Sequence, residues 1–217
     1  MNLVADFLGY VGLTVLTLLT MISPVSAAVQ FLGIGKRLDP AERERQARKA
    51  CIYAAGILVS FLLLGTLIMD VFGISIPGLR VAGGLVIAYI GFRMLFPDLA
   101  PEMPAGALAE ARAKTDISFS PLAMPSLAGP GAIAAVMAMS STIQHAEGTR
   151  AIVEHVGAVL GIGITALICY FVLSAAEQLR RKLGKVGVSA ISRIFGFLTI
   201  CIGVQFVING VSDLVRA

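Results

Sequence analysis

Charged side chains are scarce in this sequence. They account for 14% of its 217 residues, whereas hydrophobic residues account for 57% and the mean hydropathy is +0.89. A water-soluble domain of this size would have difficulty burying so much apolar surface in one core. The composition therefore predicts a polytopic membrane protein that lies in a lipid bilayer.

Motifs that enzymes and nucleotide-driven pumps need are absent. The sequence contains no phosphate-binding loop and no dinucleotide fingerprint. The only histidines, His145 and His155, fall around a predicted outer loop, where they are poorly placed to act as a base for a serine or cysteine at membrane depth. We therefore expect no enzymatic activity, no catalytic residue and no cofactor.

The cysteines and the charge balance argue against two further kinds of site. Cys51, Cys169 and Cys201 lie in apolar segments without CxxC spacing, which favours small side chains in packed helices over a metal site. The net charge is +4, but the basic residues flank apolar segments and form no stripe with interleaved aromatics. Neither a metal nor a nucleic-acid partner is expected.

Six windows without charge predict six transmembrane helices. A helix needs about 20 apolar residues to cross roughly 30 Å of hydrocarbon, and the third window reaches this length only when Arg80 and Arg93 are included. The second helix should begin well before its window, because Asp39 and Pro40 form an N-cap and a first-turn proline. The windows are 7–35, 50–69, 81–92, 117–146, 156–176 and 194–212.

Lysine and arginine are concentrated in three of the loops. The segments 36–49, 93–114 and 180–185 contain six, three and four of them, respectively. By the positive-inside rule these three loops are cytoplasmic. Both termini are then predicted to lie on the outer, periplasmic side.

The fourth window, 117–146, cannot be one continuous helix. It contains Pro121, Pro125 and the sequence Gly129-Pro130-Gly131. Proline removes a backbone donor and clashes with the carbonyl one turn earlier, so the helix must open here. Backbone opened at membrane depth is tolerated only where protein or a cavity satisfies its polar groups.

A weaker copy of this break lies near the N-terminus. The segment 20–28, which contains Ser23-Pro24, aligns with 126–134, and 80–87 in the third window matches 193–200 in the sixth. We therefore predict two inverted three-helix repeats, at 1–100 and 117–217, joined by a cytoplasmic linker at 101–116. Helices 1 and 4 would be discontinuous, as in secondary transporters.

The second break also carries a family resemblance. Pro121-Leu-Ala-Met-Pro-Ser-Leu-Ala-Gly-Pro-Gly-Ala-Ile133, together with 72–76 and 80–85, resembles the signature stretches of the MarC family of bacterial inner-membrane proteins. The resemblance covers essentially the whole chain. It implies a six-span, inverted-repeat protein of the inner membrane, similar to small neutral amino acid transporters. The family typically has Asn-Pro at the first break, where this chain has Ser23-Pro24.

Broken helices can bind a zwitterion through backbone alone. Free amides of Gly131, Ala132 and Ile133 suit a carboxylate, and free carbonyls at 19–22 suit an ammonium, although the two roles could be exchanged. Small side chains without charge would favour a ligand such as glycine, alanine or serine. The candidate substrate-binding residues are Thr20, Ser23, Pro24, Val25, Ser26, Ser126, Gly129, Pro130, Gly131 and Ala132.

Two functions follow from these patterns. The first is transport of small neutral amino acids or related small metabolites by alternating access, with the substrate held at the midplane by helices 1 and 4. The alternative is a non-transporting membrane scaffold or assembly partner. A coupling ion and a homo-oligomer are compatible with the sequence, and Gln30, Gln205 and Asn209 could contact the permeant or join helices.

Overall fold

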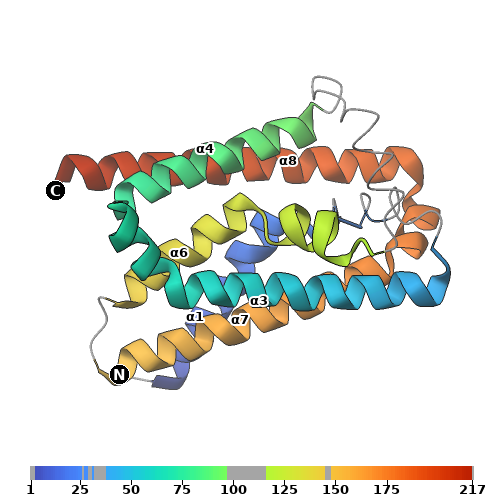
Figure 1. Cartoon of the computed structure of the whole chain (residues 1–217). Coiled ribbons are helices and arrows are strands. Elements are labelled where there is room, and N and C mark those ends of the chain that lie inside the picture. Colours follow the sequence, from blue (N-terminus) through green and yellow to red (C-terminus); the bar gives the residue numbers. More distant parts are fainter. Residues whose placement is uncertain are drawn as a thin grey trace.

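The described part of the chain is built from helices (Figure 1). The computed structural model describes residues 3–25, 27–28, 31, 38–96, 116–144 and 148–216, and no strand occurs among them. The elements are α1 (Leu3–Ile22), α3 (Pro40–Phe72), α4 (Ile76–Leu95), η3 (Ser118–Leu127), α6 (Pro130–Gln144), α7 (Thr149–Ser174) and α8 (Ala176–Arg216).

Four helices of the described chain are long and apolar enough to cross a membrane. They are α3, α4, α7 and the part Ser189–Val215 of α8. Two shorter apolar helices, Phe7–Ile22 and Pro130–Ile143, correspond to the first and fourth predicted windows. The predicted all-helical membrane protein is therefore confirmed, whereas the count of six spans stays a prediction.

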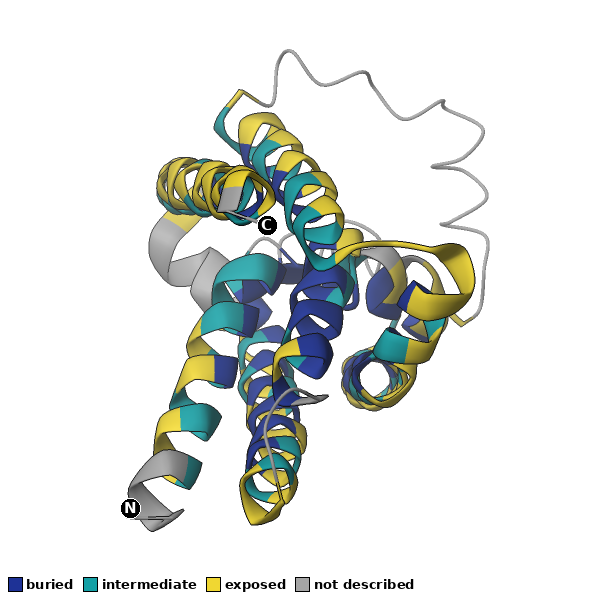
Figure 2. Ribbon diagram, turned by 90° about the vertical axis from the view of Figure 1, so that its left-hand side faces the viewer, coloured by how far each residue is buried: buried dark blue, intermediate teal, exposed yellow. Residues whose placement is uncertain are grey.

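The helices form a core and an outlying pair. Buried apolar side chains of α1, α3, η3, α6 and α7 make one continuous cluster, to which α4 and α8 contribute no residue among those described. Figure 2 shows the buried residues concentrated on the facing sides of the helices. The pair α4 and α8 runs antiparallel along one side of this core (Figure 1).

The start of α3 follows the predicted local rules. The Asp39 carboxylate accepts a hydrogen bond of 2.7 Å from the Glu42 amide, and Pro40 occupies the first turn. The Glu42 carboxylate accepts hydrogen bonds from the side chains of Arg45 and Gln46. The helix therefore begins well before the charge-free window at 50–69, as expected.

Glycines bring the backbones of α4 and α8 into direct contact. A Cβ added to Gly84 would lie 2.5 Å from the carbonyl oxygen of Gly203, and one added to Gly203 would lie 2.5 Å from the amide nitrogen of Ala88. A Cβ on Gly91 would lie 2.6 Å from the carbonyl oxygen of Gly196. We call this contact the glycine seam; no larger residue fits there while the backbones stay in place.

A salt bridge joins α4 and α8 near the C-terminal end of α8. Arg80, near the start of α4, pairs with Asp213 in the last turns of α8. Helix α4 contains both Arg80 and Arg93, as the sequence predicted. At the other end, α8 is interrupted at Gly184, whose φ of 64° is a left-handed conformation that favours glycine.

Candidate functional site

The first helix breaks where the sequence predicts it. Helix α1 ends at Ile22, and buried Ser23 adopts a φ of 46°, the only positive value found at a non-glycine residue among those described. The Ser23 amide donates to the carbonyl oxygen of Leu19 at 3.1 Å, and its own carbonyl oxygen accepts from the amide of Ala27 at 3.2 Å. The helix thus turns at Ser23 and resumes at Pro24.

The second break begins earlier, inside η3. Ser120 has φ −129° and ψ 122°, and Met124 has φ −128° and ψ 123°, both extended conformations within an otherwise helical segment. Each precedes a proline, Pro121 or Pro125, and the proline ring disfavours helical backbone at the preceding residue. The prolines therefore account for the irregularity of η3.

Helix α6 then starts at the predicted point. Pro130 is its first residue, and the Ile133 amide donates to the carbonyl oxygen of Gly129 at 3.0 Å. The expectation that Ile133 offers a free amide is therefore wrong, because one turn of helix is already closed. Of the three predicted amides, only those of Gly131 and Ala132 stay in the open first turn.

The carbonyl oxygens at the end of α1 that we expected to accept from an ammonium group need a similar correction. The Leu19 carbonyl oxygen already accepts the Ser23 amide, because the left-handed residue closes the end of the helix. The Thr20 hydroxyl donates its proton to the carbonyl oxygen of Leu16 at 2.7 Å, which leaves only its oxygen to accept from a ligand. At the C-terminal end of α1, the carbonyl oxygens that can still accept a hydrogen bond from a ligand are those of the residues that follow Leu19.

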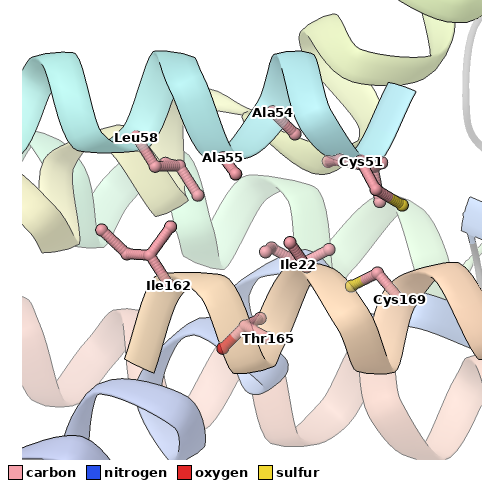
Figure 3. Close-up of a pocket in the computed structure, with 10 residues that line it drawn as sticks. Ile22, Cys51, Ala54, Ala55, Leu58, Ile162, Thr165 and Cys169 are labelled. Atoms are coloured by element: carbon pink, nitrogen blue, oxygen red, sulfur yellow. The ribbon is translucent and has the colours of Figure 1, made fainter. Parts of the chain in front are cut away.

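Both breaks lie beside one small cavity between α3 and α7 (Figure 3). Ile22, directly before Ser23, and Leu127, shortly before Gly129, each line it. The cavity is about the size of one water molecule. Thr165 also lines it, and its hydroxyl donates to the carbonyl oxygen of Gly161 at 2.8 Å. The remaining lining residues are Cys51, Ala54, Ala55, Leu58, Ile162, Ala166 and Cys169.

None of the nine predicted site residues that the structure describes lines this cavity. Ser23, Pro24, Gly131 and Ala132 are buried, Thr20, Val25, Ser126 and Gly129 are partly buried, Pro130 is exposed, and Ser26 lies outside the described residues. The side of Gly131 that would carry a Cβ faces Ile87 of α4, whose Cγ1 would be 2.8 Å away. Helix packing therefore occupies the space that we expected a ligand to use at Gly131.

The cavity residues of α3 and α7 were missed in the sequence. They follow the same spacing in both helices: 51, 54, 55 and 58 in α3, and 162, 165, 166 and 169 in α7. This is the spacing of residues on one face of a helix. Because other sides of both helices are also apolar, the sequence carries no clear signal that singles out this face.

Polar contacts tie the start of η3 to α3. The Ile117 amide donates to the side-chain oxygen of buried Gln46 at 3.2 Å, and Lys49 pairs with Asp116 at 3.2 Å. The Ser118 hydroxyl and amide both donate to Asp116. These hydrogen bonds from Ser118, with a contribution from Lys49, lower the pKa of Asp116 to about 2.

The arrangement of the helices defines the class of protein. A bundle of apolar helices, two of them broken beside a common cavity, is an integral membrane protein with discontinuous helices. Within the described residues, His, Cys, Asp and Glu side chains form no group of three or more that could hold a metal ion.

Comparison with known proteins gives the family. The family described as MarC family integral membrane protein matches residues 8–215. The inner membrane protein MarC of Escherichia coli (strain SMS-3-5 / SECEC) is 40% identical over 216 residues, which cover 97% of this chain and 98% of that protein. Its counterparts in Escherichia coli (strain K12) and Shigella flexneri are 40% identical over 220 residues, with the same coverage.

This chain therefore belongs to the MarC family, as the resemblance at Pro121–Ile133 indicated. Its relatives are named inner membrane proteins, and several of its helices are long and apolar enough to span a bilayer. It is accordingly a multi-pass inner membrane protein. No solved structure matches it.

Proposed function

We propose that this protein is a secondary transporter that moves small neutral amino acids, or related small metabolites, across the inner membrane by alternating access. The observation that carries the proposal is the convergence of the two breaks on one cavity, which Ile22 and Leu127 line from the two sides. Opened backbone at membrane depth persists where protein buries it or where it lines a cavity, and paired breaks beside one cavity are typical of secondary transporters.

An inverted repeat accounts for how the helices pair. In the described chain α1 packs on α7, and η3, the first part of the other broken helix, packs on α3. The pairs α3 with α7 and α4 with α8 each join equivalent helices of the two halves. An inverted repeat that exchanges 1–100 with 117–217 would produce these pairings, and the equal spacing of the cavity-lining residues in α3 and α7 supports it.

The chemistry beside the cavity suits a small zwitterion. The amides of Gly131 and Ala132 lie in the open first turn of α6, where the helix dipole favours a carboxylate. Carbonyls that follow Leu19 at the end of α1 suit an ammonium group. No charged residue lines the cavity, so a net-charged substrate would have no counter-charge there.

The size of the cavity supports a closed conformation. A space about as large as one water molecule cannot hold an amino acid, so α3 and α7 must separate before a substrate enters. In a transporter of this design one repeat rocks against the other, and a coupling ion supplies the driving force.

The orientation of the chain is part of the same proposal. Helix α1 begins and α8 ends at the same end of the bundle, while α3 begins and α4 ends at the opposite end (Figure 1). The loops rich in lysine and arginine flank this opposite end, which we assign to the cytoplasm. Both termini would then face the periplasm.

Filling the cavity tests the proposal. In Ala54→Leu, the added side chain occupies the space between α3 and α7, so we expect uptake of radiolabelled glycine, alanine or serine into proteoliposomes to fall at least tenfold. The three added carbon atoms exceed a space of about one water molecule, so some loss of stability is expected, and uptake is therefore normalised to the amount of folded protein in the proteoliposomes. Gly56→Leu is the matched control, since nothing lies within 4 Å of the Cβ position of Gly56 on the same helix.

Two outcomes would count against transport. One is purified wild-type protein that moves no small neutral amino acid and gains no thermal stability with any of them, although ligand binding must stabilise the folded state. The other is Ala54→Leu protein that loses stability or abundance while no solute moves in either form. That result would favour a scaffold whose broken helices serve packing alone.

A further inference from the structure

Two amide side chains on α8 point away from the rest of the protein. Gln205 and Asn209 are both exposed, and Gln205 Nε2 donates to Asn209 Oδ1 at 2.8 Å. Gln205 lies two residues beyond Gly203, and two residues turn a helix by about 200°. Because Gly203 packs against α4 in the glycine seam, Gln205 faces the opposite direction, away from the cavity and from α4.

These amides also lie deep in the membrane. Asp213, whose salt bridge with Arg80 marks the outer end of the pair, is eight residues after Gln205. At 1.5 Å per residue this places Gln205 about 12 Å further along the helix. The hydrocarbon core is roughly 30 Å thick, so Gln205 lies near its middle and Asn209 about one turn closer to the outer surface.

The bond between the two amides leaves part of each unsatisfied. Gln205 keeps its carbonyl oxygen and Asn209 keeps its amino group, and neither has a further partner among the described residues. Acyl chains offer neither donors nor acceptors, so lipid contact alone would leave these groups unpaired at a high cost. A protein partner within the membrane removes that cost.

We propose that this face of α8 is the interface with a second copy of the same chain. The face consists of Cys201, Gln205, Asn209 and Ser212, which are all exposed and spaced at four, four and three residues along one side of the helix; we call it the amide face. Its small and polar side chains are those that join helices in membranes.

The amide face is complementary to itself. Two copies with the same orientation are related by a twofold axis along the membrane normal, which places like residues at equal depth. The free oxygen of Gln205 in each copy then accepts from the free amino group of Asn209 in the other. Both amides thus gain partners in two identical hydrogen bonds, which a partner of another sequence would supply only by chance.

Cys201 makes the proposal directly testable. It is the exposed cysteine of the amide face, whereas Cys51 and Cys169 are buried in the core. Oxidation of native membranes with copper phenanthroline should join the two Cys201 thiols in a disulfide, with oxygen as the final electron acceptor. We expect a band at about twice the 22.7 kDa mass of the chain, absent in Cys201→Ser and retained in Cys51→Ser/Cys169→Ser.

Leucine substitutions separate an interface from simple lipid exposure. In Gln205→Leu/Asn209→Leu the cross-linked fraction should fall at least fivefold, and the mass in lipid nanodiscs should shift from dimer toward monomer. Folding is not at risk, because leucine is at least as compatible with lipid as an amide. Val204→Leu, an exposed position a quarter-turn away on α8, is the matched control and should leave both measurements unchanged.

The proposal fails under three results. A wild-type monomer in nanodiscs that gives no Cys201 cross-link would overturn it, and so would a dimer that the double leucine variant leaves intact. A Cys201 cross-link to a protein of different mass would assign the face to another partner. None of these results depends on whether the protein transports a solute.

Discussion

The broken helices and the glycine seam depend on different residues: proline at the breaks and glycine in the seam. At the breaks, proline interrupts the helix, and Ser120, Met124 and Ser23 leave helical backbone. In the seam, α4 and the membrane part of α8 stay regular, and glycine only removes side-chain volume so that the two backbones touch. The comparison separates a region where the helix backbone is interrupted from a region where it stays regular and closely packed.

The interactions that stabilise the two regions also differ. An opened helix exposes polar backbone groups at membrane depth, and it remains stable only because neighbours or a ligand satisfy them. Close contact of helix backbones gains dispersion energy over a long surface without opening any hydrogen bond. Mutations should therefore reduce folding stability most in the seam and should affect transport most at the breaks.

The largest effect is expected in the glycine seam. Gly203→Leu places a side chain where the Ala88 backbone lies 2.5 Å from the Cβ position, so α4 and α8 must separate. We expect a loss of about 3 kcal/mol or more in the free energy of unfolding. Thermal unfolding in nanodiscs measures it, and Gly163→Leu is the control because nothing lies within 4 Å of that Cβ position. Equal stability of the two variants would contradict a closed seam.

A smaller effect is expected at the first break. Ser23→Val puts a β-branched residue at φ 46°, a left-handed conformation that branched side chains tolerate less than serine does, so we expect a loss of roughly 1–2 kcal/mol in the free energy of unfolding. Ser23→Asn should be neutral or stabilising, because asparagine adopts this conformation more readily. The same unfolding assay compares the two variants. A valine variant as stable as the asparagine variant would show that Ser23 is not left-handed in solution.

The smallest effect is expected at Asp116, whose hydrogen bonds with Ser118 and salt bridge with Lys49 anchor the start of η3 to α3. Because the folded-state pKa of Asp116 is about 2, below its ordinary value of 3.8, its stabilisation is present above pH 3.8 and lost as the pH falls toward 2. The size should be about 0.5 kcal/mol, since Asp116 is exposed and solvent screens its pairing with Lys49. Asp116→Asn should lose this component of the acid sensitivity, measured as thermal stability between pH 5 and pH 2. An unchanged pH profile would argue against the anchor.

Local rules explain what could be predicted. The membrane class follows from composition, the start of α3 from Asp39 and Pro40, and both breaks from proline at Pro24 and Pro130. Each depends on residues within one turn of helix, so a neighbouring helix cannot easily override it. The same rules placed Arg80 and Arg93 inside one helix, as the structure confirms.

The site could be predicted only in part, because its lining depends on helix rotation. Sequence reasoning placed the ligand at the breaks themselves, but the structure uses Leu19 and Ile133 to close helix ends and fills the side of Gly131 with Ile87. The cavity is instead lined mainly by faces of α3 and α7. A charge-free helix in lipid gives little sign of which side faces protein, because both sides are apolar.

By itself, the sequence determined which segments form apolar helices and where the chain caps and breaks them, since proline geometry, capping and hydrophobic length act within a few residues. Only the tertiary structure decided which faces meet. It put the glycines of α4 against those of α8, turned the amides of Gln205 and Asn209 outward, and brought Ile22 and Leu127 to one cavity. These choices depend on how whole helix surfaces fit one another, and that fit is a property of pairs of helices distant in the chain.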